Sequence, residues 1–503
     1  MKIEIMDTTL RDGEQTSGVS FSSSEKLSIV RLLLEELKVD RVEIASARVS
    51  EGEYEAVKRM ADWAHKTGRI NQLEVLGFVD DGLSVEWIYN AGCRVMNLLC
   101  KGSLKHCKEQ LRKKSEEHIA DIRHVLELAL QKDIIVNLYL EDWSNGMTNS
   151  PEYVFFFMDQ LKDAPVNRFM LPDTLGILNP EKTYKFCKQM LERYPELRFD
   201  FHAHNDYDLA VGNVFAAALA GIEGFHTTIN GLGERAGNAS LTSVIAMLHD
   251  QLRMQTNVVE RNLFMASRMV ASYSGLRIPH NKPVTGDSVF TQCAGIHADG
   301  DRKNNLYYND LLPERFGRMR EYALGKMSGK SNIKKNLELL GIELDDEAMR
   351  EVTERITELG DKKEMVTLDD LRYVVADVLH NETNDRIKMI NYSLSLTHGL
   401  RPTATVRIEI DGVEYEQSAP GDGQYHAFSK ALWKIYTQLD KSKPVLTDYN
   451  VSIPSGGRTD ALVQTVISWN FNGKDFKTRG LDVDQTVAAI KATVKMLNMI
   501  ESF

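Results

Sequence analysis

The sequence predicts an α/β protein that begins with a (β/α)8 barrel. Three observations lead to this class: short apolar runs alternate with amphipathic runs, the alternation repeats eight times, and no glycine-rich phosphate loop follows the first run. Eight βα units over about 250 residues is the usual length of a closed barrel of the TIM type. A doubly wound open sheet is the alternative, but that fold more often carries a glycine-rich loop after its first strand.

The expected elements alternate strictly along this half of the chain. Ser22–Glu25 is a capping box, and it opens a helix that runs to about Leu37. The expected strands are Ile3–Thr9, Arg41–Ser46, Leu73–Val79, Arg94–Leu99, Ile134–Glu141, Arg168–Leu171, Arg198–His204 and Gly224–Ile229. The further helices are Glu51–Lys66, Ser84–Asn90, Ser115–Gln131, Pro151–Leu161, Pro180–Tyr194, Asp208–Ala220 and Leu241–Leu252.

The second half of the chain has a different rhythm. We predict a barrel at residues 1–256, a helical linker subdomain at 257–387 and an α+β regulatory domain at 388–503. In the linker we expect loops at Gly295–Asn305 and Gly325–Ser331, and charge-rich helices at Asp345–Leu359 and Leu368–Val378. Such a segment could lend residues to a neighbouring site.

The C-terminal domain is predicted to contain two βββα units in tandem. Each has a strand, a hairpin and a helix, and the hairpins turn at Asp411-Gly412 and Asn472-Gly473, which are favoured two-residue turns. The strands are Tyr392–Thr397, Thr405–Ile410, Val413–Gln417, Asp448–Ile453, Leu462–Asn470 and Phe476–Arg479, and the helices are Tyr425–Leu439 and Gln485–Leu497. This internal repeat favours a binding module, with a plain dimerisation domain as the alternative.

The composition argues against several classes of protein. A formal charge of −11 and a pI near 5.7 disfavour nucleic-acid and anionic-membrane partners. The five cysteines include no C-x-x-C pair, which indicates a reducing compartment and neither a disulfide framework nor a thiolate zinc site. There is no signal-peptide pattern, and no apolar run reaches the length of about 18 residues that spans a bilayer. We therefore expect a soluble, cytoplasmic protein.

Two histidines near the end of the seventh expected strand are the first candidate for a site. His202 and His204 project from the same face of a strand, about 7 Å apart along it, and a divalent cation can bridge that spacing. On spacing alone, two ordinary strand histidines are an equal alternative. Other strands favour the site, because polar residues follow nearly all of them at the end where barrels place their chemistry. These residues are Asp7–Gln15, Glu43, Glu141-Asp142, Pro172–Thr174, His202–Asp206 and Asn230–Asn238.

The residue types at these strand ends indicate a metal centre. Asp12, the two imidazoles and the amide oxygen of Asn238 would form a mixed oxygen and nitrogen site without thiolates. Such a site favours Mg²⁺, Mn²⁺ or Zn²⁺ with open positions for substrate oxygens. Arg11, beside Asp12, places a permanent cation near an oxyanion. A Lewis acid and a guanidinium at one carbonyl suit carbon–carbon bond formation or cleavage next to a ketone.

Three motifs together resemble those of the 2-isopropylmalate synthase family, which belongs to the metal-dependent acyl-CoA lyases and synthases with a TIM barrel. They are Asp7–Gln15 (DTTLRDGEQ), His202–Asp206 (HAHND) and Gly233–Ala239 (GERAGNA). Further matches are Pro172–Gly176, Asn281–Pro283, Gly295–Gly300 and Gly325–Lys330. The tail is similar to the family's leucine-sensing regulatory domain, with Gly421–Gly423 and Thr459–Ala461 at familiar places.

The resemblance implies roles for individual residues. It implies metal ligands Asp12, His202, His204 and Asn238; catalytic residues Arg11, Glu141, Glu234 and His297; and substrate contacts at Thr174, Glu43 and Ser103. Arg11 would stabilise the substrate carbonyl oxygen as it becomes an alkoxide, and Thr174 would hold the 2-oxoacid carboxylate. Glu234 and His297 would assist proton transfer, with His297 as the hypothetical base that removes the thioester methyl proton.

The reaction implied by the resemblance is a Claisen-type condensation. Acetyl-CoA and 2-oxoisovalerate would give 2-isopropylmalate and CoA in leucine biosynthesis. Leucine or a related effector would bind between the two βββα units, and the protein would be a homodimer or a higher homo-oligomer.

Two departures from the family pattern leave the identity of the 2-oxoacid open. The second strand continues as Glu43–Arg48 (EIASAR), closer to homocitrate synthases, and the fourth ends with an unusual lysine, Lys101. Arg48 or Lys101 could pair with the distal carboxylate of 2-oxoglutarate, although a solvated charge at the barrel rim is the alternative. Pyruvate, giving citramalate, and 2-oxoglutarate, giving homocitrate, are therefore kept as alternative substrates.

Two other classes of function are less favoured. A lyase that runs the reverse reaction would not need the regulatory tail. A catalytically silent regulatory paralogue would not need the intact pair Arg11 and Asp12 or the two histidines.

Overall fold

The computed structural model describes residues 3–302, 306, 309–361, 366, 371, 374–375, 378, 386–452 and 463–501. The chain divides into two compact units. The first comprises Met1–Phe290 and Asn309–Arg320, and the second comprises Thr291–Tyr308 and Glu321–Phe503. The domain boundaries predicted at residues 256 and 387 stay predictions.

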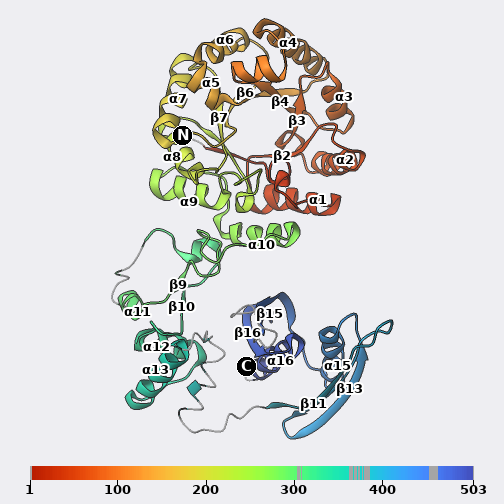
Figure 1. The fold of residues 1–503 in the computed structure, drawn as a ribbon, viewed down its shortest axis with the longest axis vertical. Helices are drawn as coiled ribbons and strands as arrows, with labels where there is room; N and C mark the ends of the chain where they lie inside the picture. The colour runs from red at the N-terminus through yellow and green to blue at the C-terminus, as the bar shows by residue number, and fades with distance from the viewer. Residues whose placement is uncertain are drawn as a thin grey trace. The chain divides into compact units, whose positions relative to one another are not determined.

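The first unit is the predicted (β/α)8 barrel, which is confirmed (Figure 1). Eight parallel strands pair in chain order, and β8 pairs back onto β1 to close the barrel. The strands are β1 (Glu4–Asp7), β2 (Arg41–Ser46), β3 (Leu73–Phe78), β4 (Val95–Lys101), β5 (Ile135–Glu141), β6 (Arg168–Asp173), β7 (Phe199–Ala203) and β8 (Gly224–Thr227). An open doubly wound sheet is thereby excluded.

Helices surround the barrel in Figure 1. They are α1 (Ser23–Arg31), α2 (Glu51–Lys66), α3 (Leu83–Asn90), α4 (Ser115–Gln131), α5 (Trp143–Asn149), α6 (Pro151–Leu161), α7 (Pro180–Arg193), α8 (Ala210–Ala220), α9 (Leu241–Leu252) and α10 (Leu263–Ser274). Shorter helical turns are η1 (Gly13–Gln15), η2 (Leu32–Leu37), η3 (Ile70–Gln72), η4 (His106–Gln110), η5 (Ile229–Gly231), η6 (Glu260–Asn262) and η7 (Pro313–Phe316). Among the α-helices α1 to α10, α5 and α10 were not predicted from the sequence.

Local sequence explains where the first helix begins and ends. Ser22 and Glu25 form the predicted capping box, in which each side chain accepts a hydrogen bond from the other residue's backbone N–H. The helix continues through the π-helical turn η2 and ends at Lys38, whose φ of 59° lies in the left-handed region. The helix therefore reaches Leu37 as predicted, with a different hydrogen-bond pattern in its last turn.

The second unit begins with a small α-helical part. It contains β9 (Thr291–Gln292), paired in parallel with β10 (Glu321–Tyr322), and α11 (Gly295–Arg302), α12 (Lys330–Leu340) and α13 (Asp346–Asp361). The loop predicted at Gly295–Asn305 is wrong over α11, because packing against α12 outweighs the low helix propensity of its glycines. The helix predicted at Leu368–Val378 and the motif Thr459–Ala461 lie largely or wholly outside the described residues.

The two predicted βββα units follow and are confirmed. Their sheets are β11 (Ile387–Ser395), β12 (Thr403–Ile410) and β13 (Val413–Pro420), then β14 (Val445–Ser452), β15 (Val463–Phe471) and β16 (Lys474–Asp482), with helices α15 (Gln424–Gln438) and α16 (Gln485–Ile500). Both hairpin turns have positive φ at their two central residues, as a type I′ turn requires. None of the described helices combines the length and hydropathy that a bilayer-spanning segment needs.

A layer of buried charge fills the barrel interior below the strand ends. The carboxylate of Asp200 on β7 lies between the guanidinium groups of Arg41 and Arg168, and the Arg168 Nη1–Asp200 Oδ1 distance is 2.9 Å. Arg41 also donates to Glu74 at 3.0 Å, and Arg168 pairs with Glu4 at 2.9 Å. Buried charges are stable only when they are paired and hydrogen-bonded in this way.

Gly224, the first residue of β8, makes room for this layer. It pairs with Asp200, and a Cβ atom built on Gly224 would lie 1.9 Å from Asp200 Oδ1. We predict that Gly224→Ala destabilises the barrel by about 2–3 kcal/mol and lowers its calorimetric unfolding midpoint by several degrees, because the carboxylate must leave its ion pairs. Gly212→Ala on α8 is the control, because its Cβ meets only ordinary contacts, and we expect no loss of stability there.

Candidate active site

Three ionisable side chains converge at the C-terminal end of the barrel. Asp12 lies in the loop after β1, His202 on β7 and His204 directly after β7. Candidate ligand atoms of these residues all lie within 4.8 Å of one another, and all three residues are buried. Asp12 Oδ2 is 3.3 Å from His202 Nε2 and 3.7 Å from His204 Nε2. The two histidines are thus brought together with Asp12, as the strand-end reasoning predicted.

Asn238 lies beside this group. It forms an isolated antiparallel bridge with His204, and its Nδ2 donates to the Leu232 carbonyl at 3.0 Å. That bond leaves the amide oxygen as the unused polar atom of Asn238. The loop can approach this closely because Gly233, with a φ of 153°, has no side chain to collide with Nδ2.

Unpartnered buried atoms make this group fit a metal ion. Within the described part of the chain, Asp12 Oδ1, His202 Nδ1, His204 Nδ1 and Asn238 Oδ1 have no hydrogen-bond partner. Unsatisfied buried polar atoms are costly, and a bound cation would compensate such a cluster. One carboxylate, two imidazoles and one amide oxygen suit Mg²⁺, Mn²⁺ or Zn²⁺.

The protonation states of these residues also suit metal binding. Burial opposes ionisation of Asp12, but Arg11 and the two imidazoles together hold the pKa of its carboxyl well below the ordinary value. Burial and the neighbouring His202 lower the pKa of His204 to about 4. The group therefore contains an ionised carboxylate and a neutral imidazole, which are the forms that bind metals.

Arg11 is held by three partners, one from the loop after β1, one from β2 and one from β5. Its Nε donates to Glu43 Oε2 at 2.5 Å, its Nη1 to Asp12 Oδ2 at 3.1 Å and its Nη2 to the Tyr139 hydroxyl at 3.4 Å. Burial disfavours the charge, but Glu43 and Asp12 raise the pKa of Arg11 far above its ordinary value. The site therefore contains a fixed cation beside the candidate metal ligands.

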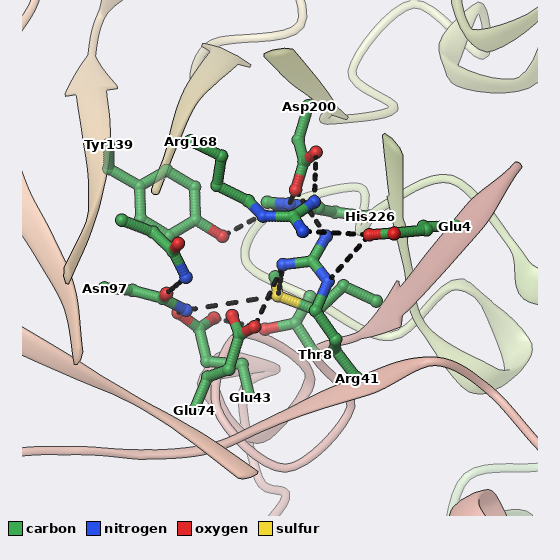
Figure 2. Close-up of polar contacts among 12 residues, drawn as sticks. Glu4, Thr8, Arg41, Glu43, Glu74, Asn97, Tyr139, Arg168, Asp200 and His226 are labelled. Carbon is green, nitrogen blue, oxygen red and sulfur yellow. Dashed lines mark hydrogen bonds and ion pairs between the residues drawn. The ribbon is translucent and has the colours of Figure 1, made fainter. Parts of the chain in front are cut away.

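Glu43 lies behind Arg11 and is fully buried. Besides Arg11, its oxygens accept hydrogen bonds from Thr8 Oγ1 at 2.7 Å and from Asn97 Nδ2 at 2.8 Å. Figure 2 shows Glu43 with Thr8 and Asn97. This arrangement orients the guanidinium, and the predicted contact of Glu43 with substrate stays a prediction.

Several other predicted residues gather at the ends of β4, β5 and β6. Lys101 and Glu141 are register partners on β4 and β5, and their side chains form an ion pair. The hydroxyl of Ser103 donates to Asp142 Oδ2 at 2.7 Å, and the hydroxyl of Thr174 accepts from the Asp142 backbone N–H at 2.9 Å. The structure thus links Ser103 and Thr174 through one aspartate.

The remaining predicted residues have different surroundings. Glu234 is largely exposed and pairs with Arg235 at 3.2 Å. Arg48 is partly exposed and pairs with Asp80 at 2.8 Å. His297 lies on α11 in the second unit, and its predicted role stays a prediction.

An apolar wall beside the metal group was missed by the sequence reasoning. We define it as Leu76 and Phe78 on β3, Leu99 on β4 and Tyr139 on β5, which belong to one cluster with Met6 and Met170. The Tyr139 ring lies edge-on to His202 at a centroid distance of 6.0 Å. Period-two spacing along β3 could have indicated that Leu76 and Phe78 share a face, but not that this face adjoins the metal group.

Asp7, at the end of β1, gives a prediction about pH. Burial raises the pKa of its carboxyl to about 7, although Thr9 bonds to it and opposes the shift. Between about pH 4 and 7 the Asp7 carboxyl is therefore protonated in the folded protein and ionised in the unfolded chain. As pH rises through this window, the group lowers the free energy of unfolding. We predict that Asp7→Asn reduces this fall by up to about 4 kcal/mol in chemical unfolding of the metal-free protein.

The control for this prediction is Asp81→Asn. Its carboxylate is 88% exposed, so the pH profile should match that of the wild type. Identical profiles for all three proteins would contradict the assignment to Asp7.

Metal binding can be tested directly. We predict that the metal-free protein binds one Mn²⁺ or Zn²⁺ per barrel in titration calorimetry, and that Asp12→Asn and His204→Ala weaken binding by more than about 100-fold. Asn238→Ala, which removes one neutral oxygen, should weaken it less. His426→Ala, in α15 of the second unit, is the control, and equal loss in this control would argue against the barrel site.

Comparisons with known proteins agree with this architecture. Residues 2–270 match the family model "HMGL-like", residues 284–364 match "Homocitrate synthase post-HMGL domain-like", and residues 365–501 match "LeuA allosteric (dimerisation) domain". The three models follow one another along nearly the whole chain.

Curated relatives also cover almost the entire chain. The chain is 34% identical to "Putative (R)-citramalate synthase CimA" of Methanopyrus kandleri, over 92% of this chain and 89% of that protein. It is 33% identical to "(R)-citramalate synthase CimA" of Methanocaldococcus jannaschii, over 99% and 100%. It is also 33% identical to "Probable 2-isopropylmalate synthase" of Methanopyrus kandleri, over 99% and 98%. The chain therefore belongs to the 2-isopropylmalate synthase family, in which an HMGL-like barrel is joined to a LeuA-type C-terminal domain.

Proposed function

We propose that this protein is an acyltransferase that condenses acetyl-CoA with pyruvate to give citramalate and CoA. The observation that carries the proposal is that Arg11 contacts both Asp12, a candidate metal ligand, and Tyr139 of the apolar wall. In a 2-oxoacid bound there, the ketone oxygen would lie beside the Arg11 guanidinium and the side chain would pack against the apolar wall. The names of the curated relatives support pyruvate as the 2-oxoacid.

The metal group would activate the ketone. Asp12, His202, His204 and Asn238 would hold a divalent cation, which supplies a Lewis acid that polarises the 2-oxoacid carbonyl. Arg11 would donate hydrogen bonds to the same oxygen and stabilise it as negative charge develops. Because Glu43 fixes the guanidinium from behind, Arg11 needs little rearrangement during the reaction.

The remaining steps need proton transfer and positioning of water. We assign removal of the acetyl methyl proton to His297 on the resemblance of its motif alone, with Glu234 assisting. Glu141 lies two residues beyond Tyr139 on β5, so it faces the same side of the strand and could orient the water that hydrolyses the thioester. Thr174 and Ser103 would bind the carboxylate of the 2-oxoacid.

The ion pairs at the rim disfavour 2-oxoglutarate as the substrate. Lys101 is paired with Glu141, and Arg48 is paired with Asp80. A distal carboxylate would have to break one of these pairs to find a partner. The homocitrate alternative therefore receives less support than a 2-oxoacid with an apolar side chain.

Production of 2-isopropylmalate is the second candidate. A relative with that name has nearly the same identity as the citramalate synthases, and an apolar wall also suits the isopropyl group of 2-oxoisovalerate. The size of the space beside the wall would decide between the two substrates. A lyase activity is not favoured, because the chain carries the LeuA-type domain.

We also propose an assembly and a mode of regulation. The match to the LeuA allosteric (dimerisation) domain supports a homodimer or higher homo-oligomer, and leucine or a related branched-chain product as effector. We place the enzyme in the cytoplasm, in agreement with its reduced cysteines.

The substrate assignment can be tested by measuring thiol release from acetyl-CoA. We predict that kcat/KM is highest for pyruvate, lower for 2-oxoisovalerate and lowest for 2-oxoglutarate. Leu99→Ala should enlarge the space beside the wall and raise the ratio of 2-oxoisovalerate to pyruvate kcat/KM by about tenfold or more. Leu130→Ala, on the exposed face of α4, should leave the ratio unchanged.

Two results would contradict the proposal in different ways. A higher kcat/KM for 2-oxoisovalerate than for pyruvate would favour the second candidate. Absence of CoA release with every 2-oxoacid in the metal-loaded protein would reject the condensation itself.

A further inference from the structure

A chain of hydrogen bonds runs from Arg11 into the ionic layer of the barrel interior. The Tyr139 hydroxyl lies 2.9 Å from His226 Nδ1, and His226 Nε2 lies 3.1 Å from Asp200 Oδ2. Figure 2 shows Tyr139, His226 and Asp200 in this order, with Arg41 beside the aspartate. All four side chains are more than nine-tenths buried. This series of hydrogen bonds joins residues from β2, β5, β7 and β8, so it exists only in the closed barrel.

The contacts of Asp200 determine where the proton lies in the hydrogen bond between His226 Nε2 and Asp200. Arg41 and Arg168 contact opposite oxygens of Asp200, so the buried carboxylate lies in ion pairs with two guanidinium groups. An ionised carboxylate only accepts hydrogen bonds. His226 Nε2 must therefore carry a proton and donate it to Asp200.

The contacts of Tyr139 determine the direction of its hydroxyl proton. In the described part of the chain, the Tyr139 hydroxyl has two hydrogen-bond partners, Arg11 Nη2 and His226 Nδ1. The guanidinium is only a donor, so the hydroxyl proton can go only to Nδ1. This requires an imidazole that is protonated at Nε2 alone, with Nδ1 as the acceptor.

The directions of all three hydrogen bonds follow. Arg11 donates to the Tyr139 oxygen, Tyr139 donates to His226, and His226 donates to Asp200. The proton of Tyr139 thus points away from the metal group, and its oxygen faces the guanidinium. A reversed imidazole would place an N–H against the tyrosine hydroxyl and a lone pair against the Asp200 carboxylate.

We propose that His226 is a positioning residue for the condensation reaction: it turns the Tyr139 hydroxyl into a hydrogen-bond acceptor that holds Arg11 toward the 2-oxoacid carbonyl. Asp200 sets the tautomer of His226 and acts through it. This inference rests on the proposed function for its catalytic consequence, whereas the hydrogen-bond directions stand on the structure. Without an acceptor at His226 Nδ1, the hydroxyl proton would be free to turn toward Arg11 and weaken the Arg11–Tyr139 hydrogen bond, and the transition state would lose more stabilisation than the bound substrate.

Two conservative variants separate the two ends of the imidazole. In His226→Asn, an amide oxygen takes the place of Nδ1 and can still accept from Tyr139. In His226→Gln, an amide nitrogen takes the place of Nε2 and can still donate to Asp200, but the acceptor for Tyr139 is lost. We expect His226→Asn to keep kcat within about threefold of the wild type, and His226→Gln to lower kcat by about tenfold or more with little change in KM for the 2-oxoacid.

A double-mutant cycle with Tyr139→Phe tests whether His226 acts through the hydroxyl. If it does, His226→Gln should have little further effect on kcat in the Tyr139→Phe protein. Equal losses of kcat from His226→Gln with and without the hydroxyl would overturn the proposal, and so would equal kcat values for the Asn and Gln variants. Unfolding midpoints of all variants, measured in parallel, identify losses that come from the fold.

A readout without turnover separates this inference from the proposed function. In the metal-loaded protein labelled with ¹⁵N-histidine, we expect the resonances missing from His226→Gln to be those of a neutral imidazole protonated at Nε2. A ring protonated at Nδ1, or at both nitrogens, would overturn the inference even if the enzyme is active. Absence of CoA release from a protein with the expected tautomer would instead reject the condensation and its catalytic consequence, and leave the hydrogen-bond directions standing.

Discussion

The buried guanidinium of Arg11 is the constraint on which the candidate site depends. A cation this deeply buried is stable only if its charge is paired and its N–H groups are hydrogen-bonded. Asp12, Glu43 and Tyr139 meet this requirement from the loop after β1, from β2 and from β5. These residues are far apart in sequence, so only barrel closure brings them together. The electrostatics of the site therefore depend directly on the fold of the barrel.

The same constraint connects two layers of charge inside the barrel. The upper layer contains Arg11 and the candidate metal ligands, and the lower one contains Asp200 between two guanidinium groups. Removing one member of a buried ion pair typically costs about 3–5 kcal/mol, because its partner is left uncompensated. Tyr139 and His226 link the layers through hydrogen bonds, so a change in the lower layer can reach the site without any contact with substrate.

Sequence patterns predicted the barrel and the metal group for a physical reason. Strand ends in a barrel meet at one face, so Asp12, His202 and His204 could be grouped without knowing their contacts. The apolar wall and His226 could not be found in this way, because residues that point into a barrel look like ordinary core residues in sequence. Their proximity depends on strand register, which period-two spacing does not give. The helix α11 was missed because its packing partner lies about thirty residues later.

The proposed preference among 2-oxoacids rests on two energetic penalties of unequal size. A carboxylate placed against the wall would lose its hydration and find the nearby cations Lys101 and Arg48 already paired, which is a large penalty. An isopropyl group in place of a methyl group needs only more space, and one methylene in an apolar pocket changes discrimination by about 1–3 kcal/mol. Relatives named for the two reactions are equally similar to this chain, each with 33% identity. If the proposed function holds, rejection of 2-oxoglutarate should survive single substitutions in the wall, whereas the proposed preference for pyruvate should not.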